Sequence, residues 1–324
     1  MSTFNNTKIS VAITHDKKIY IPVVVGEITV EWVRFATPGK MTLTVYKDSA
    51  LKFREGDVVT LKINGSQFFF GFIFTYERAG DKRYTLTCYD VLRYLKSSDV
   101  FKMKKMTYTK ALKTACKRYG LKTGSIANTR YVRKGKVFTG SVYDMLENYR
   151  KKTKNATGDT YILSAKWNKI TLRKQSSMKT NYVIDATLMK DFTYSSSIDD
   201  GVYTVVKLYR TKGKKTKVYS RTQKAAKKKY GRLTYANSTT EKKKAKIKKQ
   251  LKKIGNAHDS PVKKLSFSGV FGIQSIRAGS GVKVKLSAVG MKLNRNMTVD
   301  KVTHHFKDGV HTMDLTVVGG AYSA

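Results

Sequence analysis

The sequence predicts a mainly β fold with α+β parts, and three observations support it. Alternating apolar and polar residues, which give a strand one apolar face, recur near both ends of the chain, for example over residues 41–46 and 282–286. One turn-and-strand motif occurs twice, and a helical period appears only between its two copies. The predicted architecture is two related β-barrel-like domains, a small α/β domain between them, and a basic helical insertion in the second β domain.

The repeated motif begins with an Arg-x-Gly turn, at residues 54–56 in the first copy and 277–279 in the second. Each turn is followed by an alternating strand, a second strand, a hairpin containing glycine, and a third strand. Leu86 and Leu315 are predicted to occupy corresponding core positions in the third strands. Two related β units in one chain favour a symmetric, ring-like architecture.

Three domains are predicted from these changes of period. Residues 1–98 form the first β-barrel-like domain, and residues 99–175 form the small α/β domain. Residues 176–324 form the second β-barrel-like domain, which holds the Lys-rich helical insertion at about 210–256. A length of 324 residues is enough for two or three domains.

Two helices are predicted in the α/β domain. The second begins at Ser141, where Ser141-x-x-Asp144 resembles a capping box with Asp in place of Glu. The first is marked by apolar residues at helical spacing, namely Leu112, Ala115, Cys116 and Tyr119. Cys116 and Cys88, the only cysteines, are both interpreted as small buried hydrophobes rather than a disulfide pair.

The formal net charge of +43 is concentrated in part of the chain. Residues 207–255 hold 20 Lys or Arg and a single acid, Glu241. A helix is predicted from Thr240 to Ile254, with a thin apolar stripe and Gly255 as the residue that ends it. So thin a stripe buries little, so this helix must pack on its own domain or on a neighbour.

The basic segment supplies the candidate binding residues. A partner-facing basic patch is predicted at eight lysines: Lys227, Lys228, Lys229, Lys242, Lys243, Lys244, Lys248 and Lys249. Together with Tyr219, Tyr230 and Tyr235 such lysines could contact phosphates, so a nucleic-acid-binding protein is one alternative function. An acidic protein or an acidic cell-envelope polymer fits the same charge.

No motif indicates an enzyme, and no catalytic, metal or cofactor site is predicted. His304 and His305 point to opposite faces of a strand and cannot share one ion without a bulge. The sequence lacks a G-x-S-x-G elbow, a P-loop, a Rossmann fingerprint and zinc-ligand spacing. A tail-associated cell-wall hydrolase stays open as an alternative, because sequence alone cannot select a pair of catalytic acids. Without a run of 18 apolar residues, no membrane anchor is expected.

The order of these pieces resembles the baseplate hub proteins of contractile-tailed phages and phage-like particles, the XkdQ-like and late-control-D-like group. The resemblance covers nearly the whole chain, although a net charge of +43 departs from what is expected of such a hub. The matching stretches are Trp32 through Thr37-Pro38-Gly39-Lys40, Arg54-Glu55-Gly56-Asp57, Ser141-Val142-Tyr143-Asp144-Met145-Leu146, Lys229-Tyr230-Gly231 with the Lys-rich helix ending at Ile254, and Arg277-Ala278-Gly279 through Met313-Asp314-Leu315.

The resemblance implies a structural role rather than catalysis. Three chains would form a pseudo-sixfold ring of six similar β modules that joins the sixfold tail tube to the threefold central spike. The implied partners are further copies of the chain in a homotrimer, the tail tube protein, the central spike protein and other baseplate proteins, possibly a LysM-containing one, with DNA met at most in transit. The implied location is the tail baseplate of a virion or tailocin, assembled in the bacterial host cytoplasm; infectious phage and DNA-free tailocin both fit.

Overall fold

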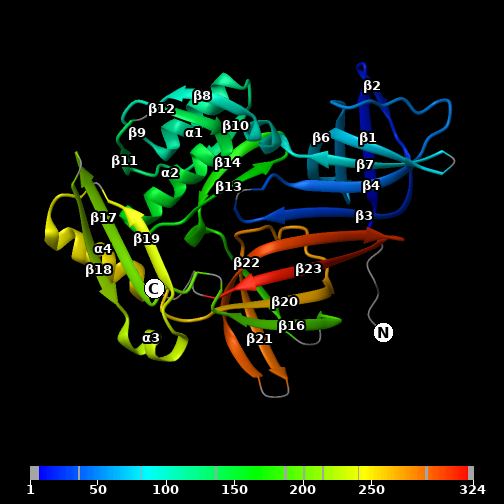
Figure 1. Cartoon of the computed structure of the whole chain (residues 1–324). Coiled ribbons are helices and arrows are strands. Elements are labelled where there is room, and N and C mark those ends of the chain that lie inside the picture. The colour runs from blue at the N-terminus through cyan, green and yellow to red at the C-terminus, as the bar shows by residue number, and fades with distance from the viewer. Residues whose placement is uncertain are drawn as a thin grey trace. The chain divides into compact units, whose positions relative to one another are not determined.

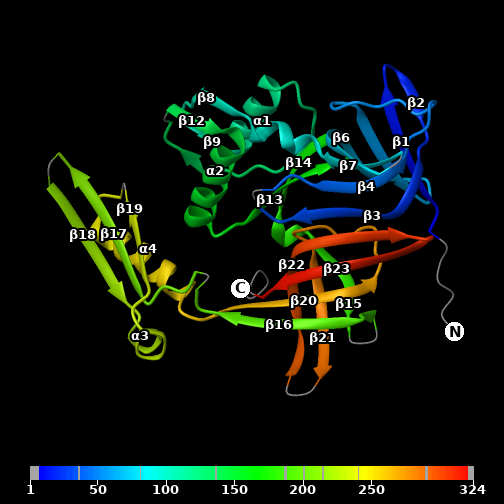
Figure 2. The ribbon, with the colours of Figure 1, turned by 45° about the vertical axis from the view of Figure 1, so that its right-hand side comes forward.

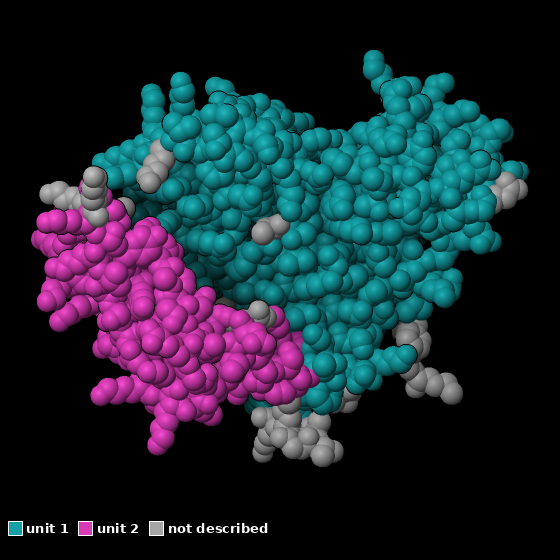
Figure 3. Space-filling view, in the orientation of Figure 1, with its two compact units in different colours: residues 1–193, 266–324 teal, residues 194–265 magenta. Residues whose placement is uncertain are grey.

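The structure is a computed structural model that describes residues 7–35, 37–80, 82–135, 137–185, 188–199, 201–213, 215–239, 241–288 and 291–319. The chain divides into two compact units (Figure 3), residues 1–193 with 266–324 and residues 194–265. The fold is mainly β, with 53% strand and 19% helix, as the sequence predicts. None of the helices in the described ranges is long and apolar enough to cross a membrane.

The first β region contains seven strands whose alternating side chains build its core. Met41, Leu43 and Val45 of one strand and Val59 and Leu61 of another are buried, as the period of two predicts. The strands are β1 (Ile9–His15), β2 (Lys18–Tyr20), β3 (Val23–Val33), β4 (Lys40–Tyr46), β5 (Val58–Ile63), β6 (Ser66–Ala79) and β7 (Arg83–Tyr89).

The second β region continues the same sheet. Its strands are β15 (Lys179–Ile184), β16 (Asp191–Ser197), β20 (Val262–Phe271), β21 (Gly281–Ala288), β22 (Met291–Lys307) and β23 (Val310–Val318). Because β22 pairs with β3, one 13-stranded sheet runs through both regions in the order β16-β20-β23-β22-β3-β4-β7-β6-β5-β1-β2. Strand β21 pairs with β22 beside this path, and β15 pairs with β21. Figure 1 shows β3 lying beside β22.

The predicted barrel closure is corrected by this sheet. Among the described residues no closed barrel forms, because the path of paired strands ends at β2 on one side and at β16 on the other. The alternating pattern predicts the strands and their buried faces, but it does not specify that β22 pairs with β3.

The middle region packs two helices against small sheets. Ser141 Oγ accepts a hydrogen bond from the Asp144 amide, and Gly158 ends the helix in the left-handed conformation, so the predicted cap is confirmed. Cys116 and Cys88 are both buried and free. The elements are η1 (Val91–Lys96), β8 (Ser98–Lys102), β9 (Met106–Thr107), α1 (Tyr108–Arg118), β10 (Thr123–Ile126), β11 (Val132–Arg133), β12 (Val137–Ser141), α2 (Val142–Thr157), β13 (Tyr161–Lys166), β14 (Lys169–Lys174) and η2 (Gln175–Ser177).

The unit of residues 194–265 has its own small core. Ile247 and Leu251 pack against Val206 and Leu208, so the thin stripe of the basic helix is buried within its own unit. The elements are β17 (Val205–Lys212), β18 (Lys215–Thr222), α3 (Lys224–Tyr230), β19 (Thr234–Ser238) and α4 (Lys244–Asn256), and the sheet order is β18-β17-β19.

The basic helix ends later in the chain than the sequence predicts. Helix α4 begins at Lys244. Just before it, Glu241 Oε1 accepts hydrogen bonds from the amides of Lys242 and Lys243. The helix continues to Asn256, so Gly255 is part of it. Gly255 lies against the side chain of Gln223, and a Cβ atom at this position would clash with that side chain. Glycine therefore permits a close approach here rather than a chain reversal. The predicted start, Thr240, lies outside the described residues.

Candidate functional site

The two Arg-x-Gly turns have the same hydrogen bonds. In the first, the Gly56 amide donates to Ile73 O at 2.8 Å and the Ile73 amide donates to Asp57 O at 2.9 Å. In the second, the Gly279 amide donates to Val299 O and the Val299 amide donates to Ser280 O, both at 2.8 Å.

Each turn is also closed by its fourth residue. The Arg54 amide donates to Asp57 Oδ2 at 2.8 Å, and the Arg277 amide donates to Ser280 Oγ at 3.1 Å. The glycines have φ of 89° and 95°, a left-handed conformation that favours glycine at this place. The two turns are therefore one structure built twice.

The strands after the turns carry the same irregularity. Phe74 is an extra residue in β6, since Ile73 pairs with Cys88 and Thr75 with Thr87 of β7. In β22 the extra residue is Asp300, since Val299 pairs with Val317 and Lys301 with Thr316 of β23. These single-residue bulges fix a common alignment in which Ile73 corresponds to Val299.

That alignment confirms the predicted core equivalence. Leu86 pairs with Tyr76, and Leu315 pairs with Val302. Each of these partners lies two residues after the extra residue of its strand, so the two leucines correspond. Both leucines are buried, at 0% and 1% exposure. The module, defined as the turn with β5-β6-β7 or with β21-β22-β23, therefore has one fold in both copies.

The strands around each module also correspond. The order β1-β5-β6-β7-β4-β3 in the first region matches β15-β21-β22-β23-β20-β16 in the second. Figure 2 shows the second set with β16 beside β20. One difference is that β1 pairs antiparallel with β5 whereas β15 pairs parallel with β21. In this correspondence residues 198–261, between β16 and β20, take the place of the short connection from β3 to β4.

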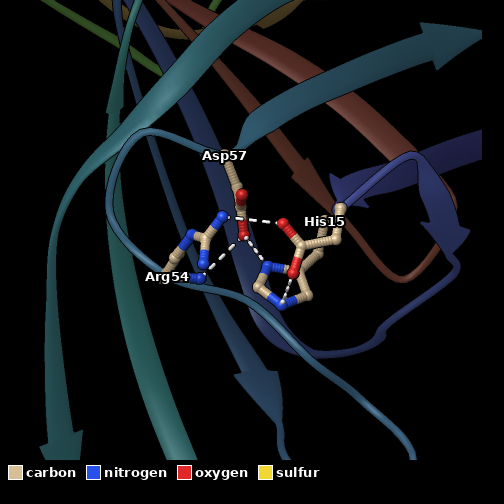
Figure 4. A network of polar contacts seen from close by, with 4 residues as sticks. His15, Arg54 and Asp57 are labelled. Atoms are coloured by element: carbon tan, nitrogen blue, oxygen red, sulfur yellow. Dashed lines mark hydrogen bonds and ion pairs between the residues drawn. The ribbon is translucent and has the colours of Figure 1, made fainter.

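The first turn lies in a polar network at the surface (Figure 4). His15 Nδ1 lies 2.7 Å from Asp57 Oδ2, and its Nε2 lies 3.3 Å from Asp16 Oδ2. Arg54 Nη2 lies 2.7 Å from Asp16 Oδ1, with both of these side chains more than 60% exposed. Surface pairs of this kind contribute little to stability. The network ties the β1–β2 turn to the start of the module.

The second turn places its arginine very differently. The Arg277 guanidinium lies 4.0 Å from the Trp32 ring and 4.3 Å from the Phe68 ring, measured from Cζ to the ring centroids. It donates to the carbonyl oxygens of Gln274 and Ile276 and, at 3.4 Å, to that of Phe68. Burial lowers its pKa to about 9, which leaves it charged at neutral pH. Arg277 thus joins the second module to β3 and β6 of the first region.

The histidines near the C-terminus belong to the same junction. His304 and His305 lie on opposite faces of β22, as the alternation predicts. His304 Nδ1 lies 2.9 Å from His311 Nε2, and its Nε2 donates to Ile276 O at 3.0 Å. His305 instead lies 3.2 Å from Glu27 and 3.1 Å from Asp314. Among the described residues no group of three or more His, Cys, Asp or Glu is arranged to hold a metal ion.

The eight predicted lysines are exposed and lie in two groups. Lys227, Lys228 and Lys229 are on α3, and the other five lie just before and along α4. Hydrogen bonds from the Lys243 and Lys242 amides lower the pKa of Glu241, which keeps that carboxylate charged among them. Their role as a partner-facing patch stays a prediction.

The three tyrosines named in the basic segment are partly buried. Tyr219 and Tyr235 are packed against the core of the small unit, with Tyr203 and Ile254. Their rings therefore stabilise this unit, and contact with phosphates stays a prediction for this segment. The sequence signal that separates these roles is weak, because Tyr suits both a small core and a wet surface.

The sequence relatives cover almost the whole chain. A sequence profile described as YQBQ-like matches residues 28–318. An uncharacterised protein of Bacillus subtilis (strain 168), YqbQ, is 30% identical over 308 residues, which cover 92% of this chain and 93% of YqbQ. The phage-like element PBSX protein XkdQ of the same organism is 28% identical over 92% of this chain and 94% of XkdQ.

Solved structures share the fold at low sequence identity. The 43 kDa tail protein of prophage MuSo2 from Shewanella oneidensis has a TM-score of 0.68 at 14% identity, covering 95% of this chain and 98% of that one. Prophage tail protein gp18 of Listeria monocytogenes EGD-e has a TM-score of 0.62 at 12% identity, covering 97% and 95%. The E. coli protein c3393, a component of the type VI secretion system described as similar to the T4 tail proteins gp27 and gp5, has a TM-score of 0.55 at 10% identity, covering 98% and 77%.

Proposed function

The chain belongs to the YQBQ-like family, and from that premise we propose that it is a structural baseplate hub of a contractile phage tail or tailocin. Membership in this family, with XkdQ among the relatives, confirms the resemblance found in the sequence. In the proposed role three chains form a pseudo-sixfold ring that joins the tail tube to the central spike.

The observation that supports this role is the repeated module. Three subunits can match a sixfold neighbour only if each subunit offers two similar surfaces, and β5-β6-β7 and β21-β22-β23 share turn, bulge and register. The finer expectation of two barrel-like walls is part of this proposal, since adjoining chains can close a sheet that a single chain leaves open. A closed ring requires large, self-complementary interfaces.

The proposed role needs no catalysis. His304, which was weighed as a metal ligand in the sequence, instead lies with Arg277 and His311 at the sheet junction. Partners in this proposal are two further copies of the chain, the tube protein, the spike protein and neighbouring baseplate proteins. The location that follows is the tail baseplate, assembled in the bacterial cytoplasm.

The oligomeric state tests the proposal. We expect the full-length protein, expressed alone or together with its spike protein, to have the mass of a trimer in native mass spectrometry or multi-angle light scattering. A protein that stays monomeric in both preparations contradicts the hub role. Degradation of cell wall in a zymogram, or DNA binding that survives about 0.3 M salt, would instead favour the hydrolase or the nucleic-acid alternative.

Charge reversal at the start of α4 tests the role of the basic unit. Lys242, Lys243 and Lys244 are exposed, so replacing all three with Glu should leave the melting temperature nearly unchanged. Acidic residues at a helix N-terminus are electrostatically favourable. If this surface meets acidic baseplate proteins, incorporation of the variant into particles should fall, and wild-type incorporation should weaken as salt is raised.

A matched control carries the same charge change elsewhere. Lys102, Lys104 and Lys105 are also exposed, in the middle region of the chain, and their triple replacement with Glu should affect incorporation less. Equal losses from both triple variants would assign the effect to net charge rather than to the basic unit. Unfolding of the isolated α4 variant would contradict the peripheral role.

A further inference from the structure

In the described part of the chain, β22 and β3 form the strand junction that joins the two β regions. Strand β22 pairs with β21 up to Thr298 and then, on the same edge, with β3 from Lys301 to Phe306. Lys301 is opposite Val33, and Phe306 is opposite Ile28, in antiparallel register. The long central strand of the second module therefore has two successive partners on one edge.

The corresponding edge of the first module has only its first partner. Strand β5 pairs with β6 as far as Phe72. Beyond the shared bulge, residues 75–79 correspond to residues 301–305, and in the described part of the chain β7 is the only strand that pairs with them. All five side chains are exposed, with Tyr76 at 40%. A strand edge left open in this way is a template for pairing with another chain.

The strand that would fill this edge can be identified by the same correspondence. In the first region β3 flanks β4, and in the second region β16 flanks β20, so β16 is the counterpart of β3. β16 is the terminal strand of the sheet path, with no described strand on its other side. Thr193, Tyr194 and Ser195 in this strand are exposed.

We propose that residues 75–79 of β6 pair antiparallel with the free edge of β16 from a second copy of this chain. This contact repeats between chains the junction that β22 and β3 make within one chain. The two edges are unlike, so the contact is head to tail, which produces a ring when the rotation between copies closes. The inference rests on the proposed trimeric hub and assigns the strands that join its subunits.

The other open edge is a weaker candidate. Strand β2 ends the sheet path near the exposed Ile19, Ile21 and Val23. It spans only three residues, and among the described residues no strand corresponds to it next to β15 in the second region. A junction at β2 therefore has no counterpart within the chain and would not give six similar contacts.

Cysteine crosslinking of the full-length protein tests the assignment. Thr75 and Glu77 correspond to Lys301 and Thr303, and one of them is replaced by Cys together with Thr193 or Ser195. The two positions chosen in each strand lie on the same face of that strand, and the four pairs together cover alignments of β6 and β16 that differ by two residues. The native cysteines are buried, so a short thiol-specific crosslinker should react mainly at the new sites.

Two further cysteine pairs serve as controls. Thr303→Cys with Glu31→Cys is opposed within the internal junction and should crosslink inside one chain without a change in mass. Lys18→Cys with Thr193→Cys tests pairing through β2. At least one β6–β16 pair should give linked dimers and trimers on a denaturing gel, in yields that exceed those of the β2–β16 pair.

The outcomes separate this inference from the hub role. A trimer by mass in which the β6–β16 pairs stay unlinked, or in which the β2–β16 pair links better, overturns the strand assignment and leaves the hub role standing. A protein that remains monomeric at all concentrations, alone and with its spike protein, overturns both. Linked species confined to two and three chains support both.

Discussion

Replacing Arg277 with alanine is expected to lower the free energy of unfolding by about 2–4 kcal/mol. The change removes a charged group held between the Trp32 and Phe68 rings, together with its hydrogen bonds to the carbonyl oxygens of Gln274 and Ile276. The Ile276 carbonyl keeps its hydrogen bond from His304. A desolvated cation–π contact contributes about 2 kcal/mol, and a hydrogen bond from a charged group about 1.5–3 kcal/mol. Denaturant unfolding followed by tryptophan fluorescence measures the loss, because Trp32 lies in the affected junction.

The repeat supplies a matched control for this variant. Arg54 occupies the same turn position, but its side chain is 62% exposed and pairs with the equally exposed Asp16. Arg54→Ala should therefore change the free energy of unfolding by about 0–1 kcal/mol. Similar losses from the two substitutions would mean that the shared turn, rather than the junction, is what each arginine stabilises. A large loss for Arg277 alone would show that the second module is anchored to the first through this side chain.

The repeated turn could be predicted from the sequence because its determinants are local. Gly56 and Gly279 each lie two residues after the arginine of the motif and adopt the left-handed conformation. The alternation that follows determines which side chains are buried. The equivalence of Leu86 and Leu315 follows from counting along both strands. The cap at Ser141 is equally local, and these are the elements that the structure confirms.

The sheet junction could not be predicted, because it depends on pairing between strands far apart in the sequence. Residues 28–33 and 301–306 pair in the sheet but are separated by most of the chain. The alternating pattern of either strand is compatible with any neighbouring strand that has an apolar face. The different roles of Arg54 and Arg277 follow from that junction, since only the second arginine meets Trp32. The same limit applies to Gly255, whose neighbour Gln223 precedes it by 32 residues.

The predicted basic patch illustrates a different limit. Charge density located an exposed segment correctly, because many lysines cannot be buried without acids to pair them. It could not show that Ile247 and Leu251 pack on Val206 and Leu208, which makes the basic segment a folded unit with its own sheet. A folded unit inserted between the counterparts of β3 and β4 presents its lysines at fixed positions, a condition for recognising one partner.

The pH dependence of stability should reveal the buried histidines of the junction. Burial lowers the pKa of His311 from 6.5 to about 4, and burial also lowers the pKa of His304 well below 6.5. The neutral forms fit because His304 donates from Nε2 to Ile276 O, so its Nδ1 accepts from His311 Nε2. Protonation of either ring would remove the acceptor or add a charge near Arg277.

The sign and size of the effect follow from the shift at His311. A folded-state pKa below the unfolded value favours the neutral ring, so the stabilisation is complete above pH 6.5 and is lost as the pH falls toward 4. At 1.36 kcal/mol per unit, the shift from 6.5 to about 4 corresponds to about 3 kcal/mol. The advantage of the wild type over His311→Gln, whose amide can still donate to His304, should therefore shrink by about 3 kcal/mol between pH 7 and pH 4.

Asp90 provides the opposite slope within the same protein. Burial raises its pKa from 3.8 to about 7 although its carboxyl accepts from the Gly39 and Leu92 amides. A raised folded-state pKa favours the protonated acid, so this contribution is largest below pH 3.8 and is lost as the pH rises through 7. As the pH falls from 7 to 4, the stability of the wild type should therefore rise relative to Asp90→Asn and fall relative to His311→Gln. Chemical denaturation of all three proteins from pH 4 to pH 7 measures both differences, and parallel curves for wild type and His311→Gln would show that His311 titrates alike in the folded and unfolded chain.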